Sequence, residues 1–249
     1  MSVAQQETIW IVGASAGIGR ALAQLYASKD AKLVLSARSH EALDALNKEL
    51  GGVHVVLPLD VSDQQAIDRA IITLKTDQIV IDRAIFMAAI YKPHSIEMMD
   101  LDFAHQLLQV NVLGCFIFAK SIFNFMKQQG HGQIAICGSV AAYTGLPNGQ
   151  PYSASKAALR NFTESLYFEA PDTIDIKLIS PGFVQTRTTD LNDFKMPHLM
   201  APNEAAVAIE KGLKTKRFEV HFPKRFTLQL KLLAFLPYWL SLKIVRHFF

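Results

Sequence analysis

Short apolar segments alternate with longer amphipathic ones along most of this chain of 249 residues. The short segments lie at residues 9–12, 32–36, 53–57, 84–88, 133–137 and 174–179, and a last one lies near residues 218–222. Apolar runs of this length predict buried strands. The stretches between them carry apolar residues at helical spacing, which predicts helices at residues 17–29, 40–50, 63–74, 103–127 and 152–169. This alternation indicates βαβ units, so we expect an α/β fold: a doubly wound parallel sheet with helices on both faces.

The composition of the chain narrows the classes of protein to which it can belong. Half of the residues are hydrophobic, so we expect a single domain at residues 1–222 and an apolar helical extension at residues 223–249. The 25 basic and 22 acidic side chains nearly balance, which argues against a nucleic-acid groove. Cys115 and Cys137 lie in apolar runs and are expected to be buried, reduced thiols. The N-terminus lacks the basic start and apolar stretch of a secretion signal, so we expect a cytoplasmic protein.

Three glycines follow the first predicted strand and begin the first predicted helix. Gly13, Gly17 and Gly19, with Ser15 and Ile18 between them, form a strand-to-helix turn. Missing side chains permit a tight turn and let the backbone approach a pyrophosphate at the helix N-terminus. Such glycines can also serve packing alone. In a βαβ unit they favour a dinucleotide site of the Rossmann type.

The end of the second predicted strand bears on which dinucleotide binds. Arg38 lies where an acidic residue would hydrogen-bond a free adenosine ribose. A guanidinium suits a 2′-phosphate, and Ser15 adds a hydroxyl, so NADP (NADPH) is favoured over NAD. Alternatively, Arg38 is a solvated residue at a helix start. Asp60 and Val61, which end the third strand, are expected beside the adenine; Asp60 could instead cap the next helix, as could Ser62.

Tyr152 and Lys156 lie four positions apart in a predicted helix and therefore share one face. An ammonium group near the phenol stabilises the phenolate and lowers the pKa of Tyr152 from its ordinary value of about 10. This predicts a tyrosine that can exchange a proton during carbonyl reduction.

Several short motifs occur together in one order. They are Gly13-x-x-x-Gly17-x-Gly19, Asp60-Val61, Asn111-Val112-x-Gly114, Ser139, Tyr152-x-x-x-Lys156 and Pro181-Gly182-x-Val184-x-Thr186. In this order and spacing the chain resembles the short-chain dehydrogenase/reductase (SDR) family over residues 8–186. Any one of these motifs is weak alone, but the ordered set is specific. The resemblance implies an NADP-dependent oxidoreductase that transfers a hydride between nicotinamide and a ketone or secondary alcohol.

The resemblance also implies a role for each matching residue. Tyr152 would be the general acid/base and Ser139 would hydrogen-bond the substrate oxygen. Lys156 would hold the nicotinamide ribose, and Asn111 would support a water that resupplies the proton. The remaining cofactor contacts would come from Ala88, Ala89, Pro181, Gly182, Val184 and Thr186. Taken singly, the four catalytic candidates have structural explanations: a surface aromatic, a snorkelling lysine, a turn asparagine and a strand-end hydroxyl.

Two departures from the family pattern are visible. Val12 precedes the glycine turn where the family usually has Thr, and residues 86–89 read Phe-Met-Ala-Ala where Asn-Asn-Ala-Gly is usual. The second change removes two side-chain amides that brace the central sheet near the cofactor. An alternative function is therefore a non-catalytic dinucleotide-binding sensor or scaffold on the same fold.

Other reaction classes find little support in the sequence. The histidines lack metal-ligand spacing, no paired carboxylates suit hydrolysis, and Ser139 is not in a Gly-x-Ser-x-Gly turn. We predict no metal site. Residues 186–202 lose clear periodicity but keep Phe194, Met196, Leu199 and Met200, which is typical of a lid over a substrate pocket. These residues favour an apolar, lipid-like substrate, although they could equally be core.

The C-terminal extension has two possible roles. Leu228, Leu232 and Phe235 share a helix face, and basic residues line its edge. The helix could pack on the body, a neighbouring subunit or the substrate pocket. It could instead lie at a membrane surface, with Tyr238 and Trp239 at headgroup level, since its uncharged stretch is far shorter than the roughly 20 residues of a membrane span. The family resemblance also suggests a homodimer or homotetramer joined through the long helices that hold Asn111 and Tyr152.

Overall fold

A parallel sheet forms the centre of the molecule. The computed structural model describes residues 6–187, 189 and 196–248. Within these residues seven parallel strands form one sheet in the order β3-β2-β1-β4-β5-β6-β7. The strands are β1 (Thr8–Val12), β2 (Lys32–Ser36), β3 (Val55–Val56), β4 (Arg83–Phe86), β5 (Gly132–Cys137), β6 (Ile174–Pro181) and β7 (Glu219–Phe222). The strand order reverses between β1 and β4, which confirms the doubly wound sheet and places a crevice beyond their carboxyl ends.

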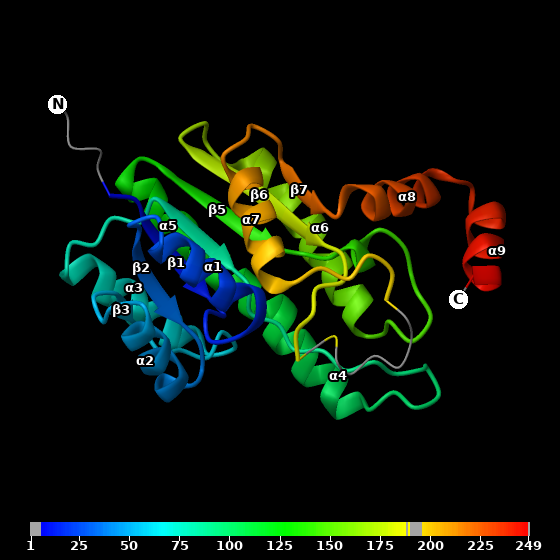
Figure 1. The fold of residues 1–249 in the computed structure, drawn as a ribbon, viewed down its shortest axis with the longest axis horizontal. Helices are drawn as coiled ribbons and strands as arrows, with labels where there is room; N and C mark the ends of the chain where they lie inside the picture. The colour runs from blue at the N-terminus through cyan, green and yellow to red at the C-terminus, as the bar shows by residue number, and fades with distance from the viewer. Residues whose placement is uncertain (1–5, 188, 190–195, 249) are drawn as a thin grey trace.

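Helices cover both faces of this sheet (Figure 1). They are α1 (Gly17–Ala27), α2 (His40–Glu49), α3 (Gln64–Thr76), α4 (Leu101–Leu108), α5 (Gly114–Gln129), α6 (Tyr152–Glu169), α7 (Pro202–Leu213), α8 (Lys224–Phe235) and α9 (Tyr238–Phe248). A π-helical turn, η1 (Gln109–Leu113), joins α4 to α5, and a 3₁₀ turn, η2 (Val140–Ala142), follows β5.

Alternate residues of each strand face opposite layers. In β1, Trp10 and Val12 pack with α3, α5 and α6, whereas Ile9 and Ile11 pack with α1, α2 and α7. All four are fully buried. A strand covered on both faces needs apolar residues at every position, which is why the strands appear as unbroken apolar runs in the sequence.

The sequence placed the strands well and some other elements poorly. The second strand has the predicted bounds, whereas the third shortens to Val55–Val56. Helix α7 was not predicted. The predicted helix at residues 103–127 is longer, Leu101–Gln129, and contains the π-helical turn. By length and composition it is the one helix of the described chain that could cross a membrane, but Phe118, Ile122 and Met126 pack in the core of this sheet.

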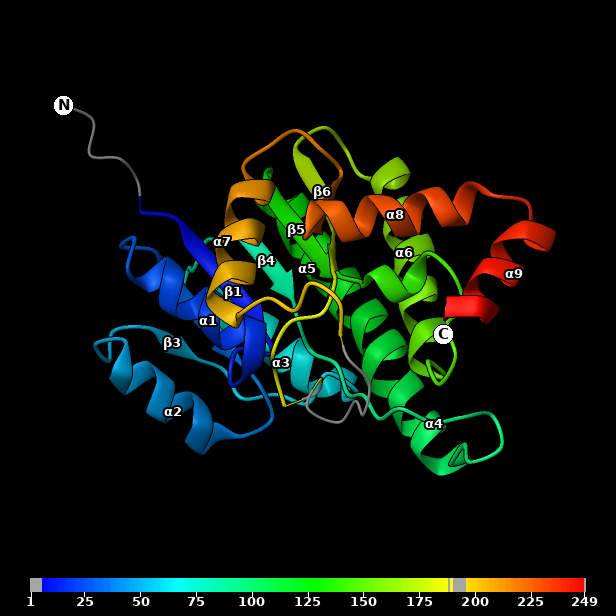
Figure 2. The same cartoon turned by 45° about the vertical axis from the view of Figure 1, so that its right-hand side comes forward.

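The C-terminal extension forms two helices rather than one. Helix α8 ends at Phe235 and α9 begins at Tyr238, because Leu236 is extended and Pro237 follows it. Figure 2 shows both helices reaching away from the sheet. Helix α8 packs on the body through Phe226 and Leu230, and not through the face of Leu228, Leu232 and Phe235 that the sequence suggested.

Polar contacts also attach α8 to the sheet. Glu219 at the start of β7 accepts a hydrogen bond from the Tyr143 hydroxyl and forms an ion pair with Lys231 of α8. Burial raises the pKa of Glu219, but hydrogen bonds from Lys231, Ser180 and Tyr143 outweigh this and hold the pKa below its usual value. The extension is therefore joined to the segment that follows Ser139.

A histidine under α8 predicts a pH effect on stability. The Nδ1 atom of His221 lies 2.6 Å from the hydroxyl oxygen of Thr227. Burial and the neighbouring cations Lys231 and Lys224 lower the pKa of His221 to about 4. The folded state disfavours the protonated form of His221, so protonation lowers the stability of the fold. The full stability is present above about pH 6.5 and is lost as the pH falls toward about 4.

We expect His221→Asn to reduce this dependence. Asn keeps a hydrogen-bonding atom near Thr227 but does not titrate. Between about pH 7 and about pH 5 the wild type should lose on the order of 1 kcal/mol more unfolding free energy than the variant, after allowance for solvent screening. Urea unfolding at both pH values measures the difference. Equal losses in the two proteins would show that His221 does not couple to folding.

Candidate active site

A cleft of about 790 Å³ opens beyond the carboxyl ends of the central strands. Every residue predicted to bind the cofactor lines it. They are Gly13, Ser15, Gly17, Ile18, Gly19, Arg38, Asp60, Val61, Ala88, Ala89, Tyr152, Lys156, Pro181, Gly182, Val184 and Thr186, and Ser139 lines it too. A volume of this size falls within the range of small-molecule and cofactor sites.

The glycine turn between β1 and α1 leaves no room for side chains. Gly13 has φ +96°, and a Cβ atom there would lie 2.7 Å from the backbone nitrogen of Ala88. A Cβ atom at Gly19 would lie 2.1 Å from the carbonyl oxygen of Gly13. Gly17 has φ +54° and faces Thr186, so the turn meets the segment after β6. These positions need glycine because the backbone folds tightly against itself.

The start of α1 fits a dinucleotide pyrophosphate. Its N-cap, Ala16, offers no capping side chain, and the first turn of the helix has no acidic residue. Ala16, Gly17, Ile18 and Gly19 all line the cleft. Backbone N–H groups at a helix N-terminus, together with the helix dipole, favour an anion. The residues present are therefore suited to the phosphates of a dinucleotide.

Arg38 lines this cleft just after β2. It is exposed and directly precedes Ser39, the N-cap of α2. Within the described chain Arg38 forms no ion pair, whereas Arg20, another residue of the cleft wall, is paired with Glu49. The alternative that Asp60 caps α3 is wrong: Asp63 caps that helix, and Asp60 accepts hydrogen bonds from Ser62. Burial raises the pKa of Asp60. The hydrogen bonds from Ser62 and the charge of Arg38 outweigh this and hold the pKa below its usual value.

Tyr152 and Ser139 come together at the other end of the cleft. Ser139 follows β5 and accepts a hydrogen bond of 3.1 Å from the backbone of Ala141. Tyr152 begins α6, is half-buried, and receives the edge of the Tyr91 ring at a centroid distance of 4.8 Å. The Ser139 side chain lies close enough to the phenol to lower the pKa of Tyr152. The side chains of Tyr152 and Ser139 therefore lie near each other in the cleft wall.

Lys156 lies one turn further along α6 and is almost fully buried. Its ammonium nitrogen donates a hydrogen bond of 2.8 Å to the carbonyl oxygen of Cys137 and lies 5.5 Å from the centre of the Tyr152 ring. Burial lowers the pKa of Lys156. Both cysteines, Cys115 and Cys137, are free and buried, as predicted.

The predicted lowering of the Tyr152 pKa is wrong for this arrangement. Burial raises the pKa of Tyr152, and the nearby Ser139 side chain opposes that rise only in part. The phenolate loses more from removal of water than it gains from its neighbours. The charge of Lys156 is not among the causes that shift the pKa of Tyr152 in this arrangement.

Asn111 lies behind the cleft wall, fully buried in the π-helical turn η1. Its side-chain oxygen accepts a 2.8 Å hydrogen bond from the backbone N–H of Ile90, and its amide nitrogen donates one of 3.0 Å to the Ile90 carbonyl. The amide also approaches the Ser155 hydroxyl at 3.4 Å. Sequence reasoning did not foresee the π-helical turn or this pairing with Ile90.

The altered residues after β4 are accommodated by apolar packing. Phe86 is fully buried, with its ring centroid 5.5 Å from that of Phe118, which meets Trp10 edge-on. Met87 lines the cleft, and its backbone N–H donates a 2.7 Å hydrogen bond to Val12. Aromatic packing thus occupies the space where the family has amide side chains.

The predicted lid lies partly outside the described residues, and Phe194 is among those not described. Of its other apolar residues, Met200 packs against the core beneath α1 and α7, and neither Met196 nor Leu199 lines the cleft. The described part of this segment contributes Thr186, Arg187, Thr189 and Pro202 to the cleft wall. No group of three or more possible metal ligands occurs among the residues described here.

A glycine turn on a helix N-terminus at the switch point of a parallel sheet defines a dinucleotide-binding α/β protein. The chain belongs to the short chain dehydrogenase family, whose sequence model matches residues 7–195. A relative from Homo sapiens, a 3-oxoacyl-[acyl-carrier-protein] reductase, is 32% identical over 190 residues, which cover 76% of this chain and 79% of that protein.

Solved structures share the whole fold. A short chain dehydrogenase from Burkholderia cenocepacia in complex with NADP has a TM-score of 0.81 at 24% identity, with coverage of 92% of this chain and 93% of that one. A short chain dehydrogenase/reductase from Burkholderia phymatum in complex with NAD has a TM-score of 0.81 at 21% identity, covering 93% and 94%. The chain therefore has the fold of this oxidoreductase family.

The tight glycine turn yields a test of the cleft. Gly19→Ala should lower the unfolding free energy by about 1 to 3 kcal/mol, because the new methyl group overlaps the Gly13 carbonyl and forces the backbone apart. Binding of NADPH, measured by fluorescence titration, should weaken at least about tenfold as the turn shifts.

Gly145→Ala is the matched control, since a Cβ atom there meets nothing within 4 Å. It should leave both NADPH binding and urea unfolding near the wild-type values. Wild-type binding by Gly19→Ala would mean that the nucleotide does not use this turn.

Proposed function

We propose that this protein is an NADPH-dependent oxidoreductase that reduces a ketone to a secondary alcohol or catalyses the reverse reaction. The observation that supports this most is that Tyr152, Ser139 and Lys156 all line the wall of one dinucleotide-sized cleft. A proton donor and an oxygen-binding group are therefore adjacent at the place where a substrate oxygen would lie.

The residues of the cleft divide into those that would hold the cofactor and those that would handle the proton. The start of α1 would hold the pyrophosphate, Arg38 and Ser15 the 2′-phosphate, and Asp60 and Val61 the adenine. Lys156 would bind the nicotinamide ribose, and the segment from Pro181 to Thr186 would lie along the nicotinamide. Bound NADPH supplies a hydride for the carbonyl carbon.

Tyr152 would donate a proton to the carbonyl oxygen during reduction. Its raised pKa keeps it protonated at neutral pH, as a donor must be. Ser139 would hold the same oxygen and stabilise its developing charge. Once Lys156 binds the ribose instead of the Cys137 carbonyl, its charge would act on the phenolate that proton transfer leaves behind. Asn111, through Ile90, would support the water that resupplies the proton.

We propose a substrate whose ketone is attached to an apolar chain. The human relative, by its name, acts on 3-oxoacyl groups, and a related acyl ketone is our first choice.

We also propose a homodimer or homotetramer joined through the long helices. Leu108 and Leu113 next to α5, and Tyr167 and Phe168 near the end of α6, are exposed apolar side chains. Exposed apolar residues gathered on neighbouring helices suit contact with a second copy.

Tyr152→Phe tests the proton-transfer role. The variant keeps the ring that packs on Tyr91 and removes only the hydroxyl, so kcat should fall by about 10² to 10⁴-fold. NADPH binding, measured by fluorescence, should stay within about twofold of wild type, since the hydroxyl belongs to the reacting end of the cleft.

Tyr167→Phe is the control, because Tyr167 lies on the same helix with half of its surface exposed. It should retain full turnover. If the wild type binds NADPH but reduces nothing across a broad panel of ketones, the enzyme proposal fails and the sensor or scaffold alternative replaces it.

Arg38→Ala tests the choice of cofactor. Loss of a charge-assisted hydrogen bond to the 2′-phosphate should lower kcat/KM for NADPH about 10 to 100-fold and leave kcat/KM for NADH almost unchanged. Arg69→Ala, an exposed arginine of α3 paired with Asp63, should change neither value. An equal loss for both cofactors with Arg38→Ala would contradict recognition of the 2′-phosphate.

A further inference from the structure

The outer face of the C-terminal helices is apolar and exposed. On α8 the exposed apolar residues recur at helical spacing, and α9 continues them beyond Pro237. We call this set the tail surface: Leu228, Leu232, Phe235, Tyr238, Trp239 and Leu242. Phe235 is 87% exposed and Trp239 is 74% exposed. Large aromatic side chains this exposed and this close together mark a contact surface.

Packing of the helices on the body does not explain these residues. The inner face of α8 already buries Phe226 and Leu230, and α9 buries Ser241 and Val245. Each helix therefore has one buried face and one exposed apolar face. Figure 1 shows α8 and α9 extending past β7, and Figure 2 shows α8 crossing in front of α6 with α9 at the edge of the molecule.

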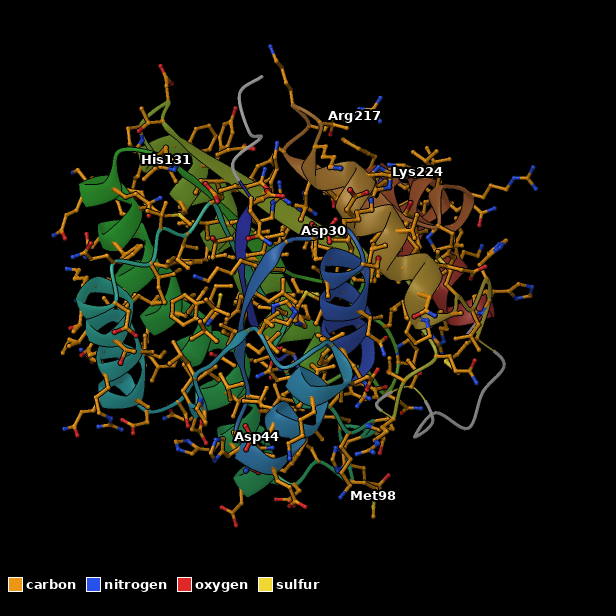
Figure 3. The ribbon with its side chains drawn as sticks, turned by 60° about the vertical axis from the view of Figure 1, so that its left-hand side comes forward. Asp30, Asp44, Met98, His131, Arg217 and Lys224 are labelled. Carbon is orange, nitrogen blue, oxygen red and sulfur yellow. The ribbon has the colours of Figure 1, made fainter. Side chains whose placement is uncertain are left out.

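The same segment is strongly basic. Residues 223–249 hold five of the 25 basic residues and none of the 22 acidic ones, so the rest of the chain has 20 basic against 22 acidic residues. Lys231 is paired with Glu219. In the part of the chain that the structure describes, Lys224, Arg225, Lys243 and Arg246 form no ion pair. Figure 3 shows Lys224 at the surface, on the same side of the molecule as Arg217.

We propose that the tail surface binds an anionic lipid bilayer, with α8 and α9 lying in the interface rather than spanning it. Leucine and phenylalanine side chains enter the acyl boundary, Trp239 and Tyr238 lie at headgroup level, and the basic residues meet anionic headgroups. A second copy of this chain fits the surface less well, because pairing two tails would bring like charges together.

Vesicle co-sedimentation with the full-length protein tests this binding. The probes are vesicles of phosphatidylcholine alone and vesicles of phosphatidylcholine mixed with phosphatidylglycerol. The protein should bind the anionic vesicles, bind the neutral ones at least about tenfold more weakly, and be released by salt. Failure of the wild type to bind anionic vesicles at low salt overturns the proposal.

Two pairs of substitutions separate the apolar and charged contributions. Phe235→Ser with Trp239→Ser should weaken binding about tenfold or more through loss of buried apolar area. Lys243→Gln with Arg246→Gln should weaken it about 30-fold, at roughly fivefold for each basic residue near an anionic surface. Val53→Ser, which changes a similarly exposed apolar side chain outside the tail surface, should bind as the wild type does.

The readout is binding and not turnover, so this test is independent of the proposed reaction. Circular dichroism should show all variants folded, since the substituted side chains are exposed. Anionic-vesicle binding that is unchanged in both tail variants would overturn the proposal. So would a fall in molar mass of the Phe235→Ser, Trp239→Ser variant in light scattering, because that result would make the tail surface a contact between copies.

Discussion

The arrangement of the candidate site depends on one buried amide. Asn111 binds both backbone groups of Ile90, and its amide also reaches Ser155. It therefore joins three elements that are far apart in sequence: the segment after β4, the long helix through η1, and α6. A buried amide that is fully paired specifies one arrangement, because any shift leaves polar groups unsatisfied. Helix α6 carries Tyr152 and Lys156, so their position relative to the cleft follows from this contact.

The sequence predicted most of the sheet and about half of the residues that line the cleft. Strands buried on both faces leave unbroken apolar runs, and cofactor residues lie where those runs end, so Gly13 and Arg38 could be placed by pattern. Thr186 was placed by the family resemblance. Contacts between distant segments left no such pattern. Two of these contacts are hydrogen bonds to backbone carbonyls, from Asn111 to Ile90 and from Lys156 to Cys137. The raised pKa of Tyr152 depends on burial. A residue sequence displays neither backbone positions nor burial.

The residues after β4 illustrate how a family pattern can change without loss of the site. Phe86 and Met87 stand where the family usually has two asparagines. Phe86 packs with Phe118, which meets Trp10, whereas Met87 packs in the opposite layer. Polar bracing has been exchanged for apolar packing, while the backbone of Met87 still pairs with Val12. The segment that holds Ala88 and Ala89 is fixed on one side by the Met87 backbone bond to Val12 and on the other by the Asn111 amide at Ile90.

Helix α8 has one face that packs on the body and one face that is exposed to solvent. Leu230 and Lys231 face inward, where Lys231 meets Glu219, Glu219 meets Tyr143, and Tyr143 lies four residues after Ser139. Leu228 and Leu232 face outward. Substitutions one or two positions apart would therefore have separable consequences, the inward ones for the loop that holds the serine and the outward ones for the surface alone. A truncation before Lys224 would remove both faces together and leave Glu219 without its cation, so deletion of the extension cannot distinguish a surface function from a structural one.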